Sequence, residues 1–276
     1  MIIFMEVLPV EQSLAAIVKE AGELMLQAKD IGNSVTQKGS PRDLVTEYDT
    51  RVQEFLRARL SEAFPAYGFF GEEEHCHDIR GKEGFFIVDP IDGTTNFVRG
   101  LHHSCISVGL CLKGRMHCAA VYNPYYDELF TATYGGGAYL NGRPLHMKAC
   151  SIEESLVLFG SAIYYRETIP ATVRLVEELF PISLDFRRGG SAALDLCYLA
   201  AGGGDLFFET CLQPWDYAAG SLIVEEAGGT VTALDGSPLK LAEPCSVAGG
   251  NKINHPQLVN IAQRIAREPE MKGRIK

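Results

Sequence analysis

An apolar run that ends in two acids constrains the fold of this chain most strongly. Residues 84–88 read G-F-F-I-V, which is typical of a buried strand, and D-P-I-D-G-T-T follows at once over residues 89–95. Asp89 and Asp92 therefore lie where a core strand ends and the chain turns. Because buried carboxylates are costly without a compensating charge, the fold must bring a positive group to this edge of the core.

The remaining pattern predicts a mixture of helices and two kinds of sheet. Apolar spacing predicts a helix over residues 11–29 and, after a polar loop over 30–42, a second helix from about 45 to 60. Short turns join the strand-like runs of residues 84–145, which indicates an antiparallel sheet. After residue 150, strands and helices alternate, so the second half is a mixed sheet. We expect a layered α+β fold, one domain over residues 1–276, with two subdomains meeting near residue 150.

Composition narrows the class of protein. The formal charge of −10 disfavours direct nucleic-acid binding but permits an anionic substrate, because bound divalent cations can invert the local field. The eight cysteines form no C-x-x-C pair, and we expect free thiols in a reducing cytoplasm. The opening M-I-I-F-M-E does not read as a signal peptide, and no run is long and apolar enough for a membrane span.

Acids gather in four short stretches beside turns or helix starts. Pro90 fixes the turn after Asp89, and Gly93 permits an unusual backbone angle, so Asp89, the Ile91 carbonyl and Asp92 can point at one spot. Mg²⁺ and Ca²⁺ prefer such oxygen ligands, and the spacing of a calcium-binding EF-hand is absent. The four stretches are D-L-V-T-E-Y-D at 43–49, G-E-E-E at 71–74, D-P-I-D-G-T-T at 89–95 and W-D-Y-A-A-G at 215–220.

Each acid also has a purely structural interpretation. Asp92 can cap a turn, Asp216 can cap a helix, and the glutamates at 72–74 can form a solvated run. Together, however, they supply the roughly four or five carboxylates that a two-metal phosphoryl-transfer site needs. A helix starting at G-T-T-N would add N–H donors for a phosphate beside those metals. We therefore expect the compensating charge to be magnesium.

These residues resemble the inositol monophosphatase family of magnesium-dependent, lithium-sensitive phosphatases. The resemblance covers roughly residues 38–230, and D-P-I-D-G-T-T-N-F is its most specific part. It implies a catalytic domain with a layered αβαβα sandwich fold, usually a homodimer. The matching stretches are G-E-E at 71–73, D-P-I-D-G-T-T-N-F at 89–97, W-D-Y-A-A-G at 215–220 and E-E-A-G-G at 225–229, with weaker matches at 43–49, 122–124 and 135–142.

The resemblance implies two principal metal sites. Glu72, Asp89 and the Ile91 carbonyl would bind the first, water-activating Mg²⁺, which makes Glu72 part of the catalytic set. Asp89, Asp92 and Asp216 would bind the second Mg²⁺. A water held by Asp92 would protonate the leaving alkoxide.

The resemblance also implies roles around the substrate. Thr94, with Asp49 behind it, would orient the attacking water, and the N–H groups of Gly93, Thr94 and Thr95 would hold the phosphate. Lys38 would lie on a mobile loop that closes over the site, with a third, weaker metal. The alcohol would contact Asp92, Glu209 and the run Gly190, Ser191 and Ala192.

Several neighbouring residues have no catalytic role in this interpretation. Glu73 and Glu74 are expected to support the site or to face solvent, and His75, Cys76 and His77 to form an exposed loop. His102 and His103 are expected to be structural or to lie at the rim. Trp215 is expected to pack beneath the Asp216 turn.

The leading substrate is myo-inositol 1-phosphate. Alternatives with the same chemistry are the 2′-phosphate of NADP, fructose 1,6-bisphosphate, histidinol phosphate and 3′-phosphoadenosine 5′-phosphate. Thr95 favours the inositol-phosphate branch, because the nucleotide branch more often has lysine there. A different class of function, a non-catalytic regulatory or RNA-associated protein on this scaffold, is disfavoured because every required acid is present.

Overall fold

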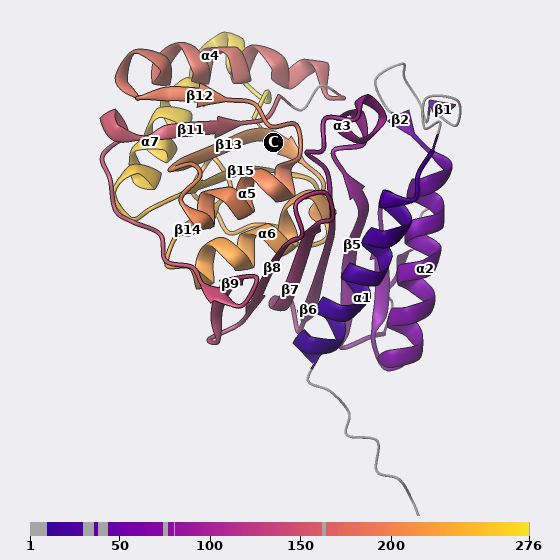
Figure 1. The fold of residues 1–276 in the computed structure, drawn as a ribbon. Coiled ribbons are helices and arrows are strands. Elements are labelled where there is room, and N and C mark those ends of the chain that lie inside the picture. The colour runs from indigo at the N-terminus through magenta and orange to yellow at the C-terminus, as the bar shows by residue number, and fades with distance from the viewer. Residues whose placement is uncertain are drawn as a thin grey trace, which may run out of the picture.

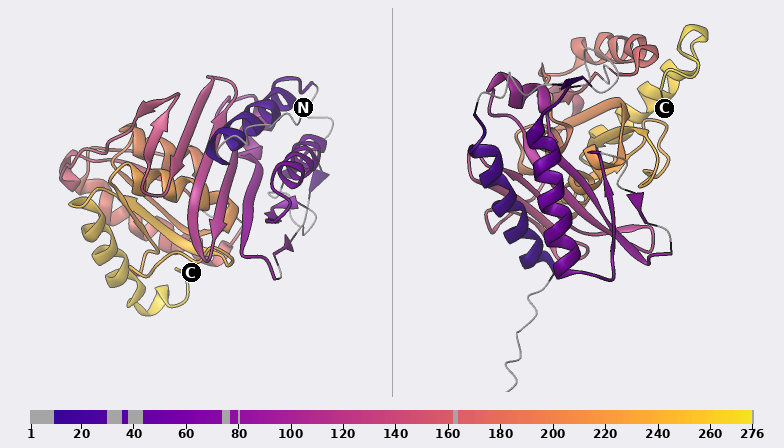
Figure 2. Two further views of the ribbon diagram at one scale, coloured as in Figure 1. Left: turned by 90° about the horizontal axis from the view of Figure 1, so that it is seen from below. Right: turned by 90° about the vertical axis from the view of Figure 1, so that its right-hand side faces the viewer.

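The computed structural model describes residues 10–29, 36–37, 44–73, 77–79, 81–161 and 164–275 (Figure 1). Its elements form the five layers expected of an αβαβα sandwich. Helices α1 and α2 cover the outer face of a large sheet, and α5 and α6 lie between that sheet and a smaller one (Figures 1 and 2). Helices α4 and α7 cover the outer face of the smaller sheet. Within the described residues, no helix has the length and apolarity needed to cross a membrane.

The two N-terminal helices follow the predicted apolar spacing, with shifted ends. Helix α1 spans Val10–Leu26 and α2 spans Glu47–Ala63. Thr46 is the N-cap of α2: its hydroxyl accepts from the N–H groups of Tyr48 and Asp49, and the Asp49 carboxylate accepts from the Thr46 N–H in return. This capping box fixes Asp49 at the start of α2.

The large sheet is antiparallel over the predicted region. It has eight strands in the order β10-β9-β8-β7-β6-β5-β3-β4, and only the β3–β5 pair is parallel. Strands β3 and β4 were not predicted from the sequence. The chain leaves β3, returns on antiparallel β4 and then crosses over, so it enters β5 parallel to β3. The strands are β3 (Gly68–Gly71), β4 (His77–Asp78), β5 (Gly84–Asp92), β6 (Cys105–Leu112), β7 (Arg115–Asn123), β8 (Glu128–Thr133), β9 (Gly137–Leu140) and β10 (Arg143–Pro144).

The smaller sheet is mixed, as expected. Its order is β12-β11-β13-β15-β14; β11 is parallel to β12 and β13, whereas β15 is antiparallel to β13 and β14. The strands are β11 (Leu156–Phe159), β12 (Asp185–Arg187), β13 (Leu206–Leu212), β14 (Thr230–Thr232) and β15 (Cys245–Gly250). A further two-stranded sheet pairs β1 (Thr36–Gln37) with β2 (Leu44–Val45). The sequence analysis missed the three-residue strand β14.

The inner helices join the two halves of the chain. One buried cluster includes side chains of the large sheet, of both inner helices and of the smaller sheet. The other helices are α3 (Thr94–Arg99), α4 (Ile169–Leu179), α5 (Ala192–Ala201), α6 (Pro214–Glu226) and α7 (Asn254–Ala266), with 3-10 turns η3 (Ile152–Glu154), η4 (Arg166–Thr168), η5 (Phe180–Ile182) and η6 (Pro269–Met271). The seven cysteines in the described part of the chain are free thiols.

Candidate metal centre

A bulge at the end of β5 directs the two motif acids. Asp89 pairs with Ser107 and Asp92 with Cys105, so the β5 strand has one residue more than β6 between these pairs. Such a bulge bends the strand and re-aims its side chains. The Asp89 carboxylate accepts from the Ile91 N–H at 3.0 Å, which holds the bulge.

Gly93 ends the bulge and begins α3, which confirms the expected helix start. Its φ of 86° lies in the left-handed region, where glycine is favoured. A Cβ atom there would lie 3.0 Å from the His103 carbonyl and 3.2 Å from the Gly190 carbonyl. The motif glycine therefore provides both the turn and the close approach of two later segments.

Three acids converge at this point. Asp89, Asp92 and Asp216 each offer a carboxylate oxygen, and these atoms lie within 4.8 Å of one another. Asp216 comes from the third position of α6, where it accepts from the Gln213 N–H at 2.8 Å. Carboxylate oxygens beside the Ile91 carbonyl are a donor set that fits a hard divalent cation.

The pKa values of the three acids are raised, as expected for a cluster of carboxylates that a cation would stabilise. Burial, and then repulsion from Glu72 and Asp92, raises the pKa of Asp89 well above its ordinary value. Burial, and then repulsion from Asp92 and Glu72, does the same to the pKa of Asp216. Burial raises the pKa of Asp92 to about 6, although hydrogen bonds from Ser191 and Ala193 act in the opposite direction. A divalent cation would offset this mutual repulsion.

Nearly all the predicted site residues line one cavity of about 440 Å³. Asp49 does not line it: its side chain is buried, at 1% exposure, and contacts Thr94 from the side away from the cavity. Lys38, Glu74, His75 and Cys76 lie outside the described residues. The predicted residues that line the cavity are Glu72, Asp89, Ile91, Asp92, Gly93, Thr94, Thr95, Gly190, Ser191, Ala192, Glu209 and Asp216.

Residues at the start of α5, in the second half of the chain, donate hydrogen bonds to the Asp92 carboxylate. Ser191 is the N-cap of α5, and its hydroxyl donates to Asp92 Oδ2 at 2.5 Å. The Ala193 N–H donates to the same oxygen at 2.8 Å. Asp92 therefore bridges the bulge of β5 and the start of α5, in addition to facing the cavity.

Glu209 reaches the cavity from β13. It is 8% exposed, and a Cβ atom on Gly160 would lie 1.8 Å from Glu209 Oε2. Gly160, which the sequence analysis did not select, thus leaves the space that the Glu209 carboxylate occupies. Its place directly after a short strand was the only signal for it in the sequence.

Other lining residues were also missed. Arg188 lies at the cavity, where its Nε donates to the Ser161 hydroxyl at 3.2 Å. Asp195 is one helical turn beyond Ser191. The position of Arg188 directly before G-G-S could have indicated its role from the sequence. Asp195 lies within an apolar helical run, which gave no such indication. The further lining residues are Asn96, Gly160, Tyr164, Tyr165, Cys211, Leu212, Gln213 and Trp215.

Of the two places expected for Glu73, the structure excludes the solvent-facing one. Glu73 is 4% exposed, and Gln53 binds its main-chain N–H at 2.8 Å and its carbonyl at 2.7 Å. Trp215 packs against Phe70, with ring centroids 5.5 Å apart, as expected beneath the Asp216 turn, but it also lines the cavity.

Comparison with known proteins gives one consistent result. The model of the inositol monophosphatase family matches residues 6–267. The Nus factor SuhB of Escherichia coli is 36% identical over 251 residues, which are 90% of this chain and 94% of that protein. The inositol-1-monophosphatase of Rhizobium meliloti is 39% identical over 244 residues, or 86% and 90% of the two chains.

A solved structure extends the comparison to the fold. The IMPase-II of Staphylococcus aureus, in a crystal structure with bound inositol monophosphate, matches with a TM-score of 0.79 and 29% identity. The match covers 93% of this chain and 94% of that one. The same protein was also solved with bound 2′AMP.

Proposed function

The chain belongs to the inositol monophosphatase family, and from that premise we propose that it is a Mg²⁺-dependent phosphomonoesterase acting on inositol monophosphate. The observation that carries the proposal is the convergence of Asp89, Asp92 and Asp216 within 4.8 Å at one cavity. Such a cluster is unfavourable without cations, and phosphate esters are substrates whose hydrolysis divalent cations promote.

The residues that would hold magnesium come from three segments. Glu72, Asp89 and the Ile91 carbonyl would form one site, and Asp89, Asp92 and Asp216 the other. Magnesium would supply charge for the phosphate oxygens and a lowered pKa for bound water. Two or three ions per subunit are consistent with the number of acids.

The protein's own groups would position the reactants. Thr94 and Asp49 would orient the attacking water, and the main-chain N–H groups of residues 93–95 would hold the phosphate. Asp92, Glu209 and the run 190–192 would contact the alcohol. These roles agree with the places of the side chains around the cavity.

The decisive test is phosphate release from a panel of esters while Mg²⁺ is titrated and lithium is added. The panel contains inositol 1-phosphate, NADP, fructose 1,6-bisphosphate, histidinol phosphate and 3′-phosphoadenosine 5′-phosphate. We expect Mg²⁺-dependent release that is fastest from inositol 1-phosphate and is inhibited by lithium. Absence of release from every compound by folded, Mg²⁺-binding protein would contradict the proposal.

One observation favours a second candidate substrate class. Among the described residues that line the cavity, Arg188 is the one basic side chain. A guanidinium at the mouth suits a substrate whose leaving group carries another anionic group, as in a nucleotide or a bisphosphate. The 2′AMP complex of the staphylococcal protein is compatible with this alternative.

A non-catalytic regulatory role is the third candidate. Its support is the name of the relatives called Nus factor SuhB, which are about as similar to this chain as the named inositol-1-monophosphatases are. The complete set of acids around the cavity argues for catalysis instead. The phosphate-release panel separates the two, since a purely regulatory protein would release none.

We further propose a cytoplasmic homodimer. Free thiols suit a reducing compartment.

Four large apolar side chains are exposed along α4, η5 and the edge of β12, which is the kind of surface that a subunit interface covers. They are Val173, Phe180, Ile182 and Leu184. Sedimentation of the native protein and of Phe180→Asp tests this, with a monomeric native protein as the contrary result.

A further inference from the structure

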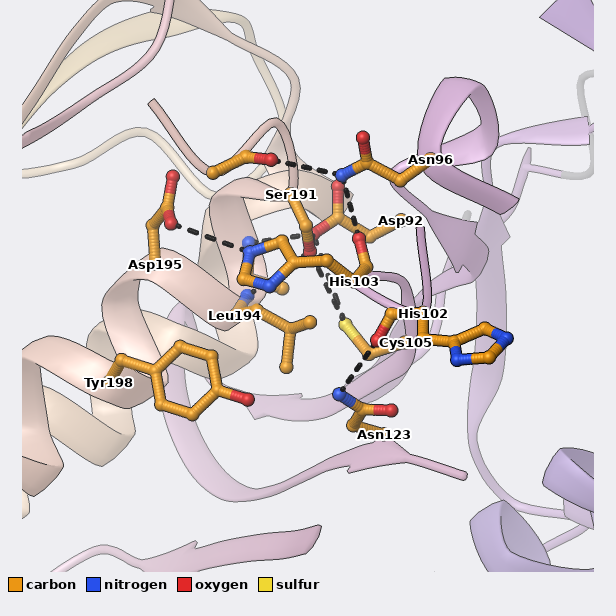
Figure 3. A network of polar contacts seen from close by, with 12 residues as sticks. Asp92, Asn96, His102, His103, Cys105, Asn123, Ser191, Leu194, Asp195 and Tyr198 are labelled. Carbon is orange, nitrogen blue, oxygen red and sulfur yellow. Dashed lines mark hydrogen bonds and ion pairs between the residues drawn. The ribbon is translucent and has the colours of Figure 1, made fainter. Parts of the chain in front are cut away.

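The side chain of Asn96 joins two segments that are far apart in sequence. Its Nδ2 donates to the His103 carbonyl at 2.7 Å and to the Gly189 carbonyl at 3.0 Å (Figure 3). Asn96 itself is 7% exposed. Both amide hydrogens are therefore used, one for the turn before β6 and one for the loop before α5. The roles proposed above for the D-P-I-D-G-T-T-N-F motif leave this residue without one.

The loop that Asn96 holds is closely packed on both sides. A Cβ atom on Gly189 would lie 2.1 Å from Asp195 Oδ1 and 2.7 Å from His103 Nε2. Gly190 has a φ of 84°, and a Cβ atom there would lie 3.2 Å from Asn96 Nδ2. The Asn96 amide therefore lies against one side of the loop, and the His103–Asp195 pair, which Figure 3 shows, lies against the other.

This loop continues directly into the groups that hold Asp92. Ser191 Oγ and the Ala193 N–H both donate to Asp92 Oδ2, at 2.5 and 2.8 Å. Because both bonds end on Oδ2, neither uses Oδ1. The orientation of the carboxylate relative to Asp89 and Asp216 therefore depends on where residues 191–193 lie.

We propose that Asn96 is a positioning residue for Asp92. It acts through the chain of contacts from its amide to Gly189, and from Ser191 and Ala193 to the Asp92 carboxylate. This inference rests on the proposed function for its kinetic consequence, but the placement of Asp92 exists in the protein without substrate. Moving a catalytic group by about 1 Å can cost about 10²-fold in rate.

The test compares Asn96→Asp and Asn96→Ala with a matched control, Asn254→Asp. Asn254 is buried like Asn96 and donates from Nδ2 to Ser155 Oγ at 3.0 Å and to the Asp205 carbonyl at 2.8 Å, but it does not line the cavity. Asn96→Asp keeps the shape and removes both donors. Asn96→Ala removes them without adding charge.

Two readouts separate positioning from simple stabilisation. The first is hydrogen exchange of the Ala193 amide in metal-free protein, corrected for global stability. The second is the division of the kinetic effect between kcat and KM. We expect both Asn96 variants to accelerate Ala193 exchange at least about tenfold and to lower kcat about 10- to 100-fold, with KM changed less than about threefold. Asn254→Asp should change neither after the correction for folded fraction.

Three results would overturn the inference. They are unchanged Ala193 exchange in the Asn96 variants, full kcat in them, or unfolding of both Asn96 variants while Asn254→Asp folds. The last would mean that Asn96 supports the fold and does not place Asp92. If native protein releases no phosphate from any ester, the proposed function fails, while Ala193 exchange in metal-free protein still decides the placement of Asp92 by Asn96.

Discussion

The hydroxyl oxygen of Thr94 lies 3.3 Å from Asp49 Oδ1, which joins the first turn of α3 to the first turn of α2. It also lies 3.2 Å from the Ile91 carbonyl. A threonine hydroxyl has one proton and both of these partners only accept, so Thr94 must be the donor to one of them. Its lone pairs then remain to accept a hydrogen bond from a water in the cavity.

Thr94→Val should therefore remove activity while Thr94→Ser keeps most of it. Valine matches threonine in shape but cannot form the hydrogen bond with the water, whereas serine keeps the hydroxyl. We expect a fall in kcat of about 10²-fold for valine, the scale of a misplaced reacting group, and less than about tenfold for serine. Steady-state phosphate release measures both. Equal loss in the two variants would show that packing, not the hydroxyl, is what matters at this position.

Asp92→Asn should abolish turnover without unfolding the protein. The asparagine oxygen can still accept from Ser191 and Ala193, while one negative charge leaves a buried cluster of three. We therefore expect a melting temperature, measured in a metal chelator, that is unchanged or higher. The exposed Asp235→Asn is the control and should leave turnover intact. A large drop in the melting temperature of Asp92→Asn would instead assign Asp92 a structural role.

The motif predicted the centre of the site because its chemistry is local. The bulge, the Gly93 turn and the start of α3 all follow from D-P-I-D-G-T-T, where proline, glycine and acids have strong positional preferences. The five-layer fold followed from the family resemblance, and the antiparallel and mixed sheets from the alternation of strands and turns. The parallel pairing of β3 with β5 was missed, because the pairing partner of a short strand depends on tertiary packing.

The periphery of the site could not be predicted for a different reason. Asn96, Gly160 and Asp195 each have a partner that is distant in sequence, namely Gly189, Glu209 and His103, and no local pattern records such contacts. The sequence could not decide between the two places expected for Glu73, because the run G-E-E-E has the composition of a solvated loop, whereas the Gln53 amide binds the Glu73 main chain. Contacts between distant segments decided these cases.

The stability of metal-free protein should fall as the pH rises, and Mg²⁺ should restore it. Burial raises the pKa of Asp92 to about 6 and the pKa values of Asp89 and Asp216 well above their ordinary range. The folded state thus binds these protons more tightly than the unfolded chain. The contribution of Asp92 to stability is complete below an ordinary pKa of about 3.9 and is lost as the pH rises through about 6. The contributions of Asp89 and Asp216 are lost as the pH rises through their own raised pKa values.

Magnesium competes with the same protons, so the Mg²⁺-induced rise in melting temperature should grow between about pH 5 and pH 8. Thermal unfolding in chelator and in millimolar Mg²⁺, across this range, measures both effects. Asp92→Asn should show a smaller Mg²⁺ effect at every pH. A Mg²⁺ shift that is absent, or independent of pH, would argue against a metal centre built from these carboxylates.

Arg188→Ala should separate the two candidate substrate classes, and Arg187→Ala is its natural control. Arg187 is adjacent and exposed, binds Asp185 and does not line the cavity.

If Arg188 binds a second anionic group, its loss should lower kcat/KM for NADP and fructose 1,6-bisphosphate about 10- to 100-fold, as expected for a charged hydrogen bond of about 1.5–3 kcal/mol. Inositol 1-phosphate, whose leaving alcohol is neutral, should change less than about threefold, and Arg187→Ala should affect none of them. An equal loss for all substrates would instead mean that Arg188 acts on the acids of the cavity, such as Asp195, whose pKa is raised by burial, an effect that His103 and then the charge of Arg188 partly oppose.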